Sequence, residues 1–132
     1  MAYVQGSAYE LPFEDRSFDA SLLLLALHEH TEAERTRMLH EAMRVARDVV
    51  LLADYEAPLH TRIHPAWQVV RFVEHIAGPE HRAGFLDFVR QGSVTGLLER
   101  HQLSAVAEER SHFGTMHLAA VSVARHPDEQ SV

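Results

Sequence analysis

Residues 3–30 decide the predicted fold of this chain, and they read YVQGSAYELPFEDRSFDASLLLLALHEH. The apolar run at residues 22–27 has no polar alternation, which is typical of a parallel strand covered on both faces. This strand ends abruptly in His28, Glu29 and His30. In open α/β sheets, ligands bind just beyond the carboxyl ends of such strands. We therefore interpret the polar trio as candidate site residues, with a solvated turn as the alternative.

A second continuous apolar run, at residues 49–53, is rich in β-formers and too short for a buried helix. Asp54, Tyr55 and Glu56 follow it, as the polar trio follows the first run. The carboxyl ends of neighbouring parallel strands meet at one edge of a sheet, where a pocket forms. The residues expected to line one cleft at this edge are Ser7, His28, Glu29, Asp54 and Tyr55.

The rest of the chain predicts helices and a closing hairpin. Thr31 and Glu34 form a capping box that begins the first helix. We expect its charged residues to form a solvated face: Glu32, Arg35, Arg37, Glu41 and Arg44. A second, strongly apolar helix is predicted from Pro65 to the Gly78-Pro79 pair, as a core helix or part of an interface. Short helices are expected at 84–89 and 93–103, and an antiparallel hairpin at 105–110 and 115–125.

The two ends of the chain are expected to contribute little. Residues 2–5 are a candidate short strand, and the polar segment from residue 126 is expected to be a disordered tail. Residues 1–125 are then one domain, which is long enough to bury its own core.

Composition excludes several classes of function. The net charge of −7 argues against nucleic acid as a partner, because phosphate binding needs a basic patch. The chain has no cysteine, which rules out disulfides and thiolate metal sites. It has no apolar run near the ~20 residues that span a bilayer, and no signal-peptide pattern. We therefore predict a cytoplasmic protein with no membrane partner.

Several sequence pieces, in order, resemble the class I methyltransferases that use S-adenosylmethionine, in particular the branch similar to ubiquinone and menaquinone C-methyltransferases. The pieces are Gly6-Ser7-Ala8, Leu11-Pro12-Phe13, Ser17-Phe18-Asp19, Leu27-His28-Glu29, Glu41-Ala42-Met43-Arg44-Val45 and Leu52-Ala53-Asp54-Tyr55. The resemblance covers residues 3–123. It implies an α/β fold: a partial Rossmann-like sheet, mostly parallel with a C-terminal antiparallel hairpin, flanked by helices.

The resemblance also implies roles for individual residues. On the cofactor side these are Gly6, Ser7, Ala8, Leu11 and Leu27. On the substrate side they are Tyr55, His75 and His81. Methyl transfer needs positioning above all, and a base only where the acceptor must lose a proton. The main candidate catalytic residues for that step are His28, Glu29 and Asp54.

One feature departs from the family, whose glycine-rich loop cradles the cofactor and whose second strand ends in a ribose-binding acid. None of the six glycines here stands in a G-x-G pattern, so the chain resembles only the C-terminal two-thirds of such an enzyme. Each missing charge-assisted contact costs about 1.5–3 kcal/mol, so we expect the isolated chain to bind S-adenosylmethionine weakly or not at all.

The resemblance leaves the strand at residues 18–26 without a neighbour on one side. Such an edge needs a partner, so we expect a homodimer or a complementing subunit. Two alternatives to a methyltransferase acting on a small molecule stay open. One is a non-catalytic remnant of the fold that serves as a binding or oligomerisation module. The other is a histidine–carboxylate metal hydrolase. The pattern Glu74-His75 then Glu80-His81 lacks the H-E-x-x-H spacing, so no metal site is predicted from it.

Overall fold

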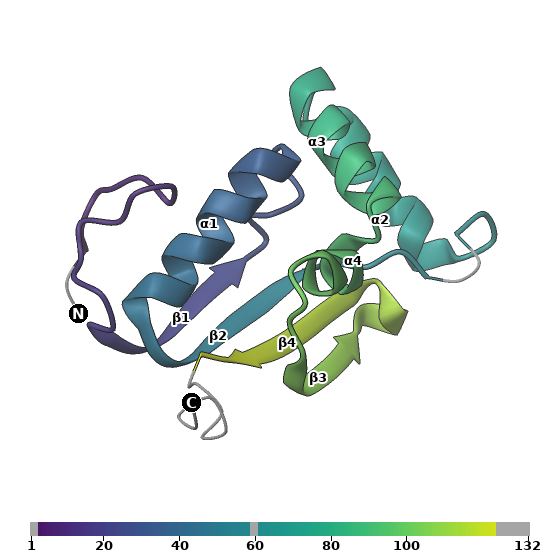
Figure 1. Ribbon diagram of the computed structural model, residues 1–132. Coiled ribbons are helices and arrows are strands. Elements are labelled where there is room, and N and C mark those ends of the chain that lie inside the picture. Colours follow the sequence, from purple (N-terminus) through teal and green to yellow (C-terminus); the bar gives the residue numbers. More distant parts are fainter. Residues whose placement is uncertain (1–2, 59–60, 124–132) are drawn as a thin grey trace.

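The computed structural model describes residues 3–58 and 61–123 of the chain. Four strands form one sheet in the order β1-β2-β4-β3 (Figure 1). They are β1 (Phe18–Leu24), β2 (Ala46–Tyr55), β3 (Ala105–Ser111) and β4 (Met116–Ser122). The β1–β2 pair is parallel, whereas the β2–β4 and β3–β4 pairs are antiparallel. The predicted α/β class and closing hairpin are confirmed. The prediction of a mostly parallel sheet is wrong for these strands, because β4 returns from the hairpin beside β2.

The helices occupy two places around the sheet. They are α1 (Glu32–Val45), α2 (Pro65–Ile76), α3 (Pro79–Arg90) and α4 (Ser93–Arg100), with a 3-10 turn at His112–Gly114. Helices α1 and α4 cover one face, while α2 and α3 lie beyond the carboxyl ends of β1 and β2 (Figure 1). The core between the sheet and its helices includes Leu39, Leu52, Phe88 and Leu97. Among the described residues, no helix is both long and apolar enough to cross a bilayer.

Helix α1 begins as its sequence indicates. Thr31 Oγ1 accepts a hydrogen bond from the Glu34 N–H at 3.4 Å, and Glu34 Oε2 accepts one from the Thr31 N–H at 2.8 Å. The predicted capping box is therefore confirmed. Helix α3 starts earlier than predicted, because Pro79 occupies its first turn directly after Gly78.

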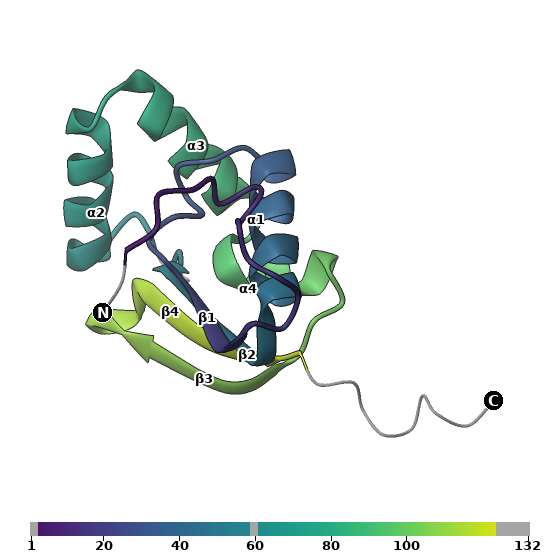
Figure 2. The ribbon, with the colours of Figure 1, turned by 90° about the vertical axis from the view of Figure 1, so that its left-hand side faces the viewer.

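Strand β1 differs from its prediction in length and in burial. It ends at Leu24 because Leu25 adopts a φ of 49°, which no extended strand accommodates. Leu22 and Leu24 are 56% and 57% exposed, so the expectation of burial on both faces is wrong. The sheet face opposite α1 and α4 carries no second layer of the described chain (Figure 2). We call this surface the open face; its exposed apolar side chains are Leu22, Leu24, Leu51 and Leu118.

The N-terminal segment is a loop held by α1, and the strand predicted at residues 2–5 is absent from residues 3–5, while residue 2 lies outside the described part. The Leu11 N–H donates to Glu41 Oε2 at 2.8 Å, and Arg44 Nη1 donates to the Phe13 carbonyl at 2.8 Å. Hydrogen bonds from Arg44 and Leu11 lower the pKa of Glu41 to about 2. Charged groups of α1 thus replace strand pairing as the anchor of this segment. The predicted tail from residue 126 also lies outside the described residues.

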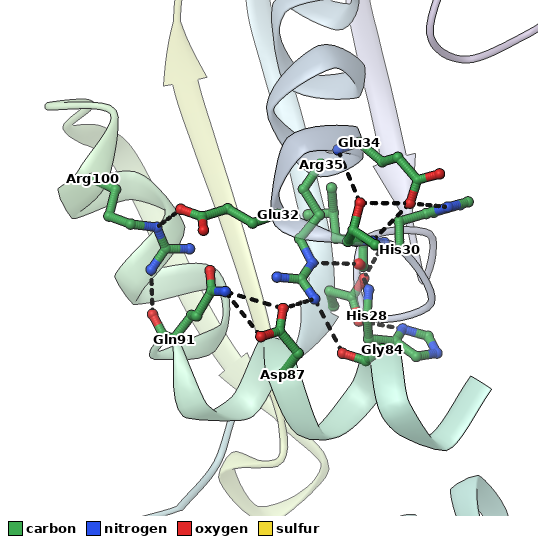
Figure 3. Close-up of polar contacts among 12 residues, drawn as sticks. His28, His30, Glu32, Glu34, Arg35, Gly84, Asp87, Gln91 and Arg100 are labelled. Atoms are coloured by element: carbon green, nitrogen blue, oxygen red, sulfur yellow. Dashed lines mark hydrogen bonds and ion pairs between the residues drawn. The ribbon is translucent and has the colours of Figure 1, made fainter. Parts of the chain in front are cut away.

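Arg35 is fully buried, so its assignment to a solvated helix face is wrong. Its Nε donates to the Leu27 carbonyl at 2.9 Å and its Nη2 to the Gly84 carbonyl at 3.1 Å (Figure 3). Nη2 also lies 3.1 Å from Asp87 Oδ2. The spacing of residues within α1 could not indicate that Arg35 is buried, because the helix that covers it, α3, comes much later in the chain. Arg35 therefore joins the end of β1 to α3.

We expect Arg35→Met to lower the free energy of unfolding by about 2–4 kcal/mol. The substitution keeps most of the volume but removes the hydrogen bonds to the Leu27 and Gly84 carbonyls and the ion pair with Asp87. Arg37→Met on the exposed side of the same helix is the matched control, and it should cost less than about 1 kcal/mol. Urea unfolding of both variants measures the difference. Equal losses for the two would contradict a structural role of the Arg35 bonds.

Candidate functional site

The carboxylate of Asp54, at the end of β2, binds the end of the β1 segment. Asp54 Oδ2 accepts hydrogen bonds from the backbone N–H groups of Leu27 at 2.8 Å and His28 at 3.3 Å. Asp54 Oδ1 lies 2.7 Å from His28 Nδ1 and also accepts from the Tyr55 N–H. Both side chains are buried. The two polar strand ends that the sequence predicted to meet are therefore in direct contact.

His28 lies in an aromatic surrounding that excludes water. Its ring centroid is 4.8 Å from that of Tyr55 and 6.4 Å from that of Phe85. Burial alone would lower the pKa of His28, but the hydrogen bond and charge of Asp54, with the charge of Glu74, outweigh it and raise that pKa. Burial also raises the pKa of the Tyr55 hydroxyl, and the charge of Glu74 adds to this. Asp54 sets the ring orientation and leaves His28 Nε2 directed away from the strands.

Helices α2 and α3 add two groups to this position. Glu74 is only 3% exposed, and it lies two turns after the buried Trp67 on the same face of α2. Glu74 Oε1 is 3.8 Å from His28 Nε2, and Glu74 Oε2 is 2.6 Å from His81 Nε2. We call these side chains the His28 cluster: His28, Glu29, Asp54, Tyr55, Glu74 and His81.

Gly84 allows α3 to reach the cluster. A Cβ atom at this position would lie 2.8 Å from the carbonyl oxygen of Glu29 and 2.9 Å from that of His28. Backbone atoms cannot move aside as a flexible side chain can. The absence of a side chain at Gly84 therefore lets α3 carry His81 against the end of β1, and the Arg35 bond to the Gly84 carbonyl holds it there.

Most of the strand-end residues that the sequence singled out come together. Glu29 is about half exposed, and its Oε1 lies 3.9 Å from His28 Nε2 and 3.6 Å from His81 Nδ1. Glu56 is buried elsewhere, with its Oε2 3.2 Å from His117 Nδ1. His75 is exposed and lines a shallow groove with Arg71 and Arg82.

The residues predicted on the cofactor side occupy two different surroundings. Gly6, Ser7 and Ala8 are exposed, and Leu11 is half-buried in the loop held by α1. Ser7 accepts from the Tyr9 N–H, and no hydrogen bond of the described residues joins it to the His28 cluster. Leu27 is fully buried in the core. The structure therefore brings His28, Glu29, Asp54, Tyr55 and His81 together. The residues predicted on the cofactor side lie outside that group, and so does His75.

Sequence reasoning did not assign Glu74 to the site. The available signal was that Glu74 is the only acidic residue of a largely apolar helix, at a spacing of seven from a tryptophan. A buried carboxylate with two histidines can hold a polar ligand or a cation, and an oriented imidazole can donate or accept a hydrogen bond.

We expect Asp54→Asn to lower the free energy of unfolding by about 1.5–3 kcal/mol, because an amide cannot accept all the hydrogen bonds that the carboxylate accepts. Asp19→Asn is the matched control, since the Asp19 carboxylate is exposed and lies 3.1 Å from the half-exposed Arg47. The control should cost less than about 1 kcal/mol. Chemical denaturation of both variants measures the difference, and a loss for Asp54→Asn within the control's range would contradict the proposed tie between strands.

Comparison with known proteins found a family model that matches part of the sequence and solved structures that share the fold. The sequence model of a family described as "Methyltransferase domain" matches residues 1–53. This span contains β1, α1 and β2 up to Ala53. No curated protein sequence matches the chain.

Two solved structures share the fold at low sequence identity. A protein from Pyrococcus horikoshii OT3 matches with a TM-score of 0.57 and 16% identity, over 89% of this chain and 57% of that one. Magnesium protoporphyrin IX methyltransferase from Synechocystis PCC 6803, solved with bound SAH, matches with a TM-score of 0.52 and 13% identity, over 89% of this chain and 48% of that one. The chain thus has the fold of these proteins and spans about half of their length.

Proposed function

We propose that this chain is an S-adenosylmethionine-dependent methyltransferase-like protein acting on a small molecule, similar to the quinone C-methyltransferase branch. The observation that carries the proposal is the methyltransferase domain match over residues 1–53, the span that supplies β1, α1 and His28. The fold shared with a methyltransferase supports it. In this proposal the His28 cluster lies on the acceptor side. His28 and Glu29 contact the acceptor and orient its polar group, and Asp54 positions His28.

The cofactor site in this proposal is completed by a second chain. Gly6, Ser7 and Ala8 supply its exposed loop, with Leu11 beside them, while a partner supplies the missing glycine-rich loop. The chain has no G-x-G pattern of its own, and it spans 48–57% of the two structures that share its fold. A homodimer that uses the open face, or a complementing subunit, would cover the exposed leucines of β1.

We expect the isolated chain to bind S-adenosylmethionine or S-adenosylhomocysteine with a Kd in the millimolar range or weaker, because contacts worth about 1.5–3 kcal/mol each are missing. The protein purified natively with its partners should bind S-adenosylhomocysteine about a thousandfold more tightly. Titration calorimetry measures both. A native complex without any cofactor binding would contradict the proposed activity. Sub-micromolar binding by the isolated chain would contradict completion by a second chain.

The second candidate function is a non-catalytic oligomerisation module, and the open face is the observation that favours it. Its four leucines are each at least 39% exposed, and α2 adds Phe72 and Ile76 as exposed apolar side chains. Apolar surface of this kind on an unpaired edge strand associates with another chain unless it is covered. Both candidate functions therefore predict assembly, and only the first also predicts cofactor binding.

We expect light scattering to show a dimer at micromolar concentration, because the exposed apolar side chains of the open face and α2 need to be covered. An obligate interface of this kind buries more than about 2,000 Å² of mostly apolar surface. Leu22→Glu on the open face and Phe72→Glu on α2 form a matched pair that adds one charge to either surface. The substitution within the interface should give a monomer, and the other should leave the dimer intact. A monomeric wild-type chain that binds no dye specific for exposed apolar surface would contradict assembly through either face.

A further inference from the structure

We propose that His28, Glu74 and His81 bind a divalent transition-metal cation, with Zn²⁺ as the best fit. Each residue offers one ligand atom, and these atoms lie within 4.8 Å of one another. The three residues come from the segment after β1, from α2 and from α3, so only the folded chain brings them together. The inference goes beyond the proposed function and does not depend on it.

Both histidines direct the same ring nitrogen towards Glu74. His28 Nε2 lies 3.8 Å from Glu74 Oε1, and His81 Nε2 lies 2.6 Å from Glu74 Oε2. Their other nitrogens face carboxylates: His28 Nδ1 is 2.7 Å from Asp54 and His81 Nδ1 is 3.6 Å from Glu29. A metal-binding histidine almost always donates its second ring N–H to such a partner, which fixes the tautomer and orients the ring. Asp54 is within hydrogen-bond distance to accept from His28 Nδ1, and Glu29 is the carboxylate that faces His81 Nδ1.

The charge of the cluster is not balanced by any arginine. Among the ion pairs of the described residues, none joins Asp54, Glu74 or Glu29 to an arginine, and every basic residue of the chain other than histidine is an arginine. With neutral imidazoles the cluster carries three negative charges, and Asp54 and Glu74 are both buried. A buried charge without a partner is costly. A divalent cation would offset most of that charge.

The geometry of the Glu74 carboxylate is a second, independent observation. Its Oε2 atom is buried and makes no hydrogen bond of regular geometry with the described residues, although His81 Nε2 lies 2.6 Å from it. Buried side-chain oxygens are nearly always hydrogen-bonded, so a carboxylate oxygen that contacts an imidazole without hydrogen-bond geometry calls for an explanation. A cation between Glu74 and the two imidazoles would coordinate the carboxylate in place of a hydrogen bond.

The donor set favours Zn²⁺ over the harder cations. Two imidazole nitrogens and one carboxylate form a known zinc ligand set, whereas Mg²⁺ and Ca²⁺ prefer oxygen ligands. Bonds of about 2.0–2.1 Å at tetrahedral angles hold ligand atoms about 3.3–3.4 Å apart. The two contacts to Glu74, at 2.6 and 3.8 Å, lie on either side of that value, so the side chains would have to shift when a cation binds. Three protein ligands leave one position open for water or a substrate oxygen. The sequence spacing did not indicate the site, because His28 is far from α2 and α3 along the chain.

The competing explanation is an ion-pair network in which both histidines are protonated and Glu74 joins them. The two explanations differ in what Glu74→Gln does to the metal-free protein. If the cluster awaits a cation, the substitution removes a buried charge that lacks a counter-ion, and the metal-free protein melts at the same temperature or higher. If the cluster is an ion-pair network, the substitution breaks it, and the melting temperature falls.

The test uses the full chain, stripped of metal by chelation and titrated with ZnCl₂ in a calorimeter. We expect one tight Zn²⁺ per chain in the wild type. Glu74→Gln and His81→Ala should each weaken that binding at least about tenfold. His75→Ala is the matched control, because His75 is the exposed neighbour of Glu74 on α2. No hydrogen bond or ion pair of the described residues joins His75 to the cluster, so this variant should bind zinc as the wild type does.

Thermal melting with and without excess ZnCl₂ provides the second measurement. Zinc should raise the melting temperature of the wild type and of His75→Ala by at least about 5 °C and leave Glu74→Gln unchanged. Co²⁺ in place of Zn²⁺ should give the intense visible absorption of a four-coordinate site. If all three variants retained zinc binding, the zinc would be bound by scattered surface histidines, and the proposal would be overturned. The absence of binding together with a lower melting temperature for metal-free Glu74→Gln would also overturn it.

Discussion

The buried carboxylate of Asp54 joins the carboxyl ends of two parallel strands, and the arrangement of the candidate site depends on this contact. One oxygen accepts the backbone N–H groups of Leu27 and His28, while the other lies against the His28 ring. Hydrogen bonds to a charged group in a low-dielectric interior are strong, so this carboxylate sets both the path of the backbone and the orientation of the imidazole. The turn that follows β1, which begins with Leu25 at a positive φ, is stabilised by it. The same group therefore serves the fold and the site.

Arg35 forms a second connection across the same region, between the Leu27 carbonyl and α3. Asp54 and Arg35 thus bind opposite backbone groups of Leu27: one takes its N–H and the other its carbonyl. Gly84 completes the contact, because only a residue without a side chain lets α3 approach the carbonyls of His28 and Glu29. These contacts bring His81 of α3 beside His28 and Glu74. The cap formed by α2 and α3 is consequently part of the site and not an addition to the sheet.

Helices cover one face of the sheet and leave the other face open, and this asymmetry is relevant to the proposed function. Val50, Leu52 and Val121 are buried under α1 and α4, whereas Leu22 and Leu24 are more than half exposed on the other face. The matched part of this chain covers only 57% and 48% of the two structures that share the fold. In the proposed function, a second chain covers this open apolar face and the unpaired edge of β1. The His28 cluster lies at the strand ends, beyond that face, so ligand binding at the cluster does not require the open face to be exposed.

Local patterns in the sequence predicted most of the elements, because each pattern acts over a few residues. The two apolar runs, the Thr31 capping box, the Pro65 helix start and the closing hairpin depend on neighbours along the chain. The polar ends of the two runs also predicted that His28 and Asp54 meet, since parallel strands end at one edge of a sheet. Other properties depend on which elements pack together. Arg35 is buried because α3 covers it, and Glu74 joins His28 because α2 lies beyond the strand ends. Leu22 is exposed because no element of the described residues covers that face. Burial and charge balance are set by neighbours distant in sequence, so only the tertiary structure decided them.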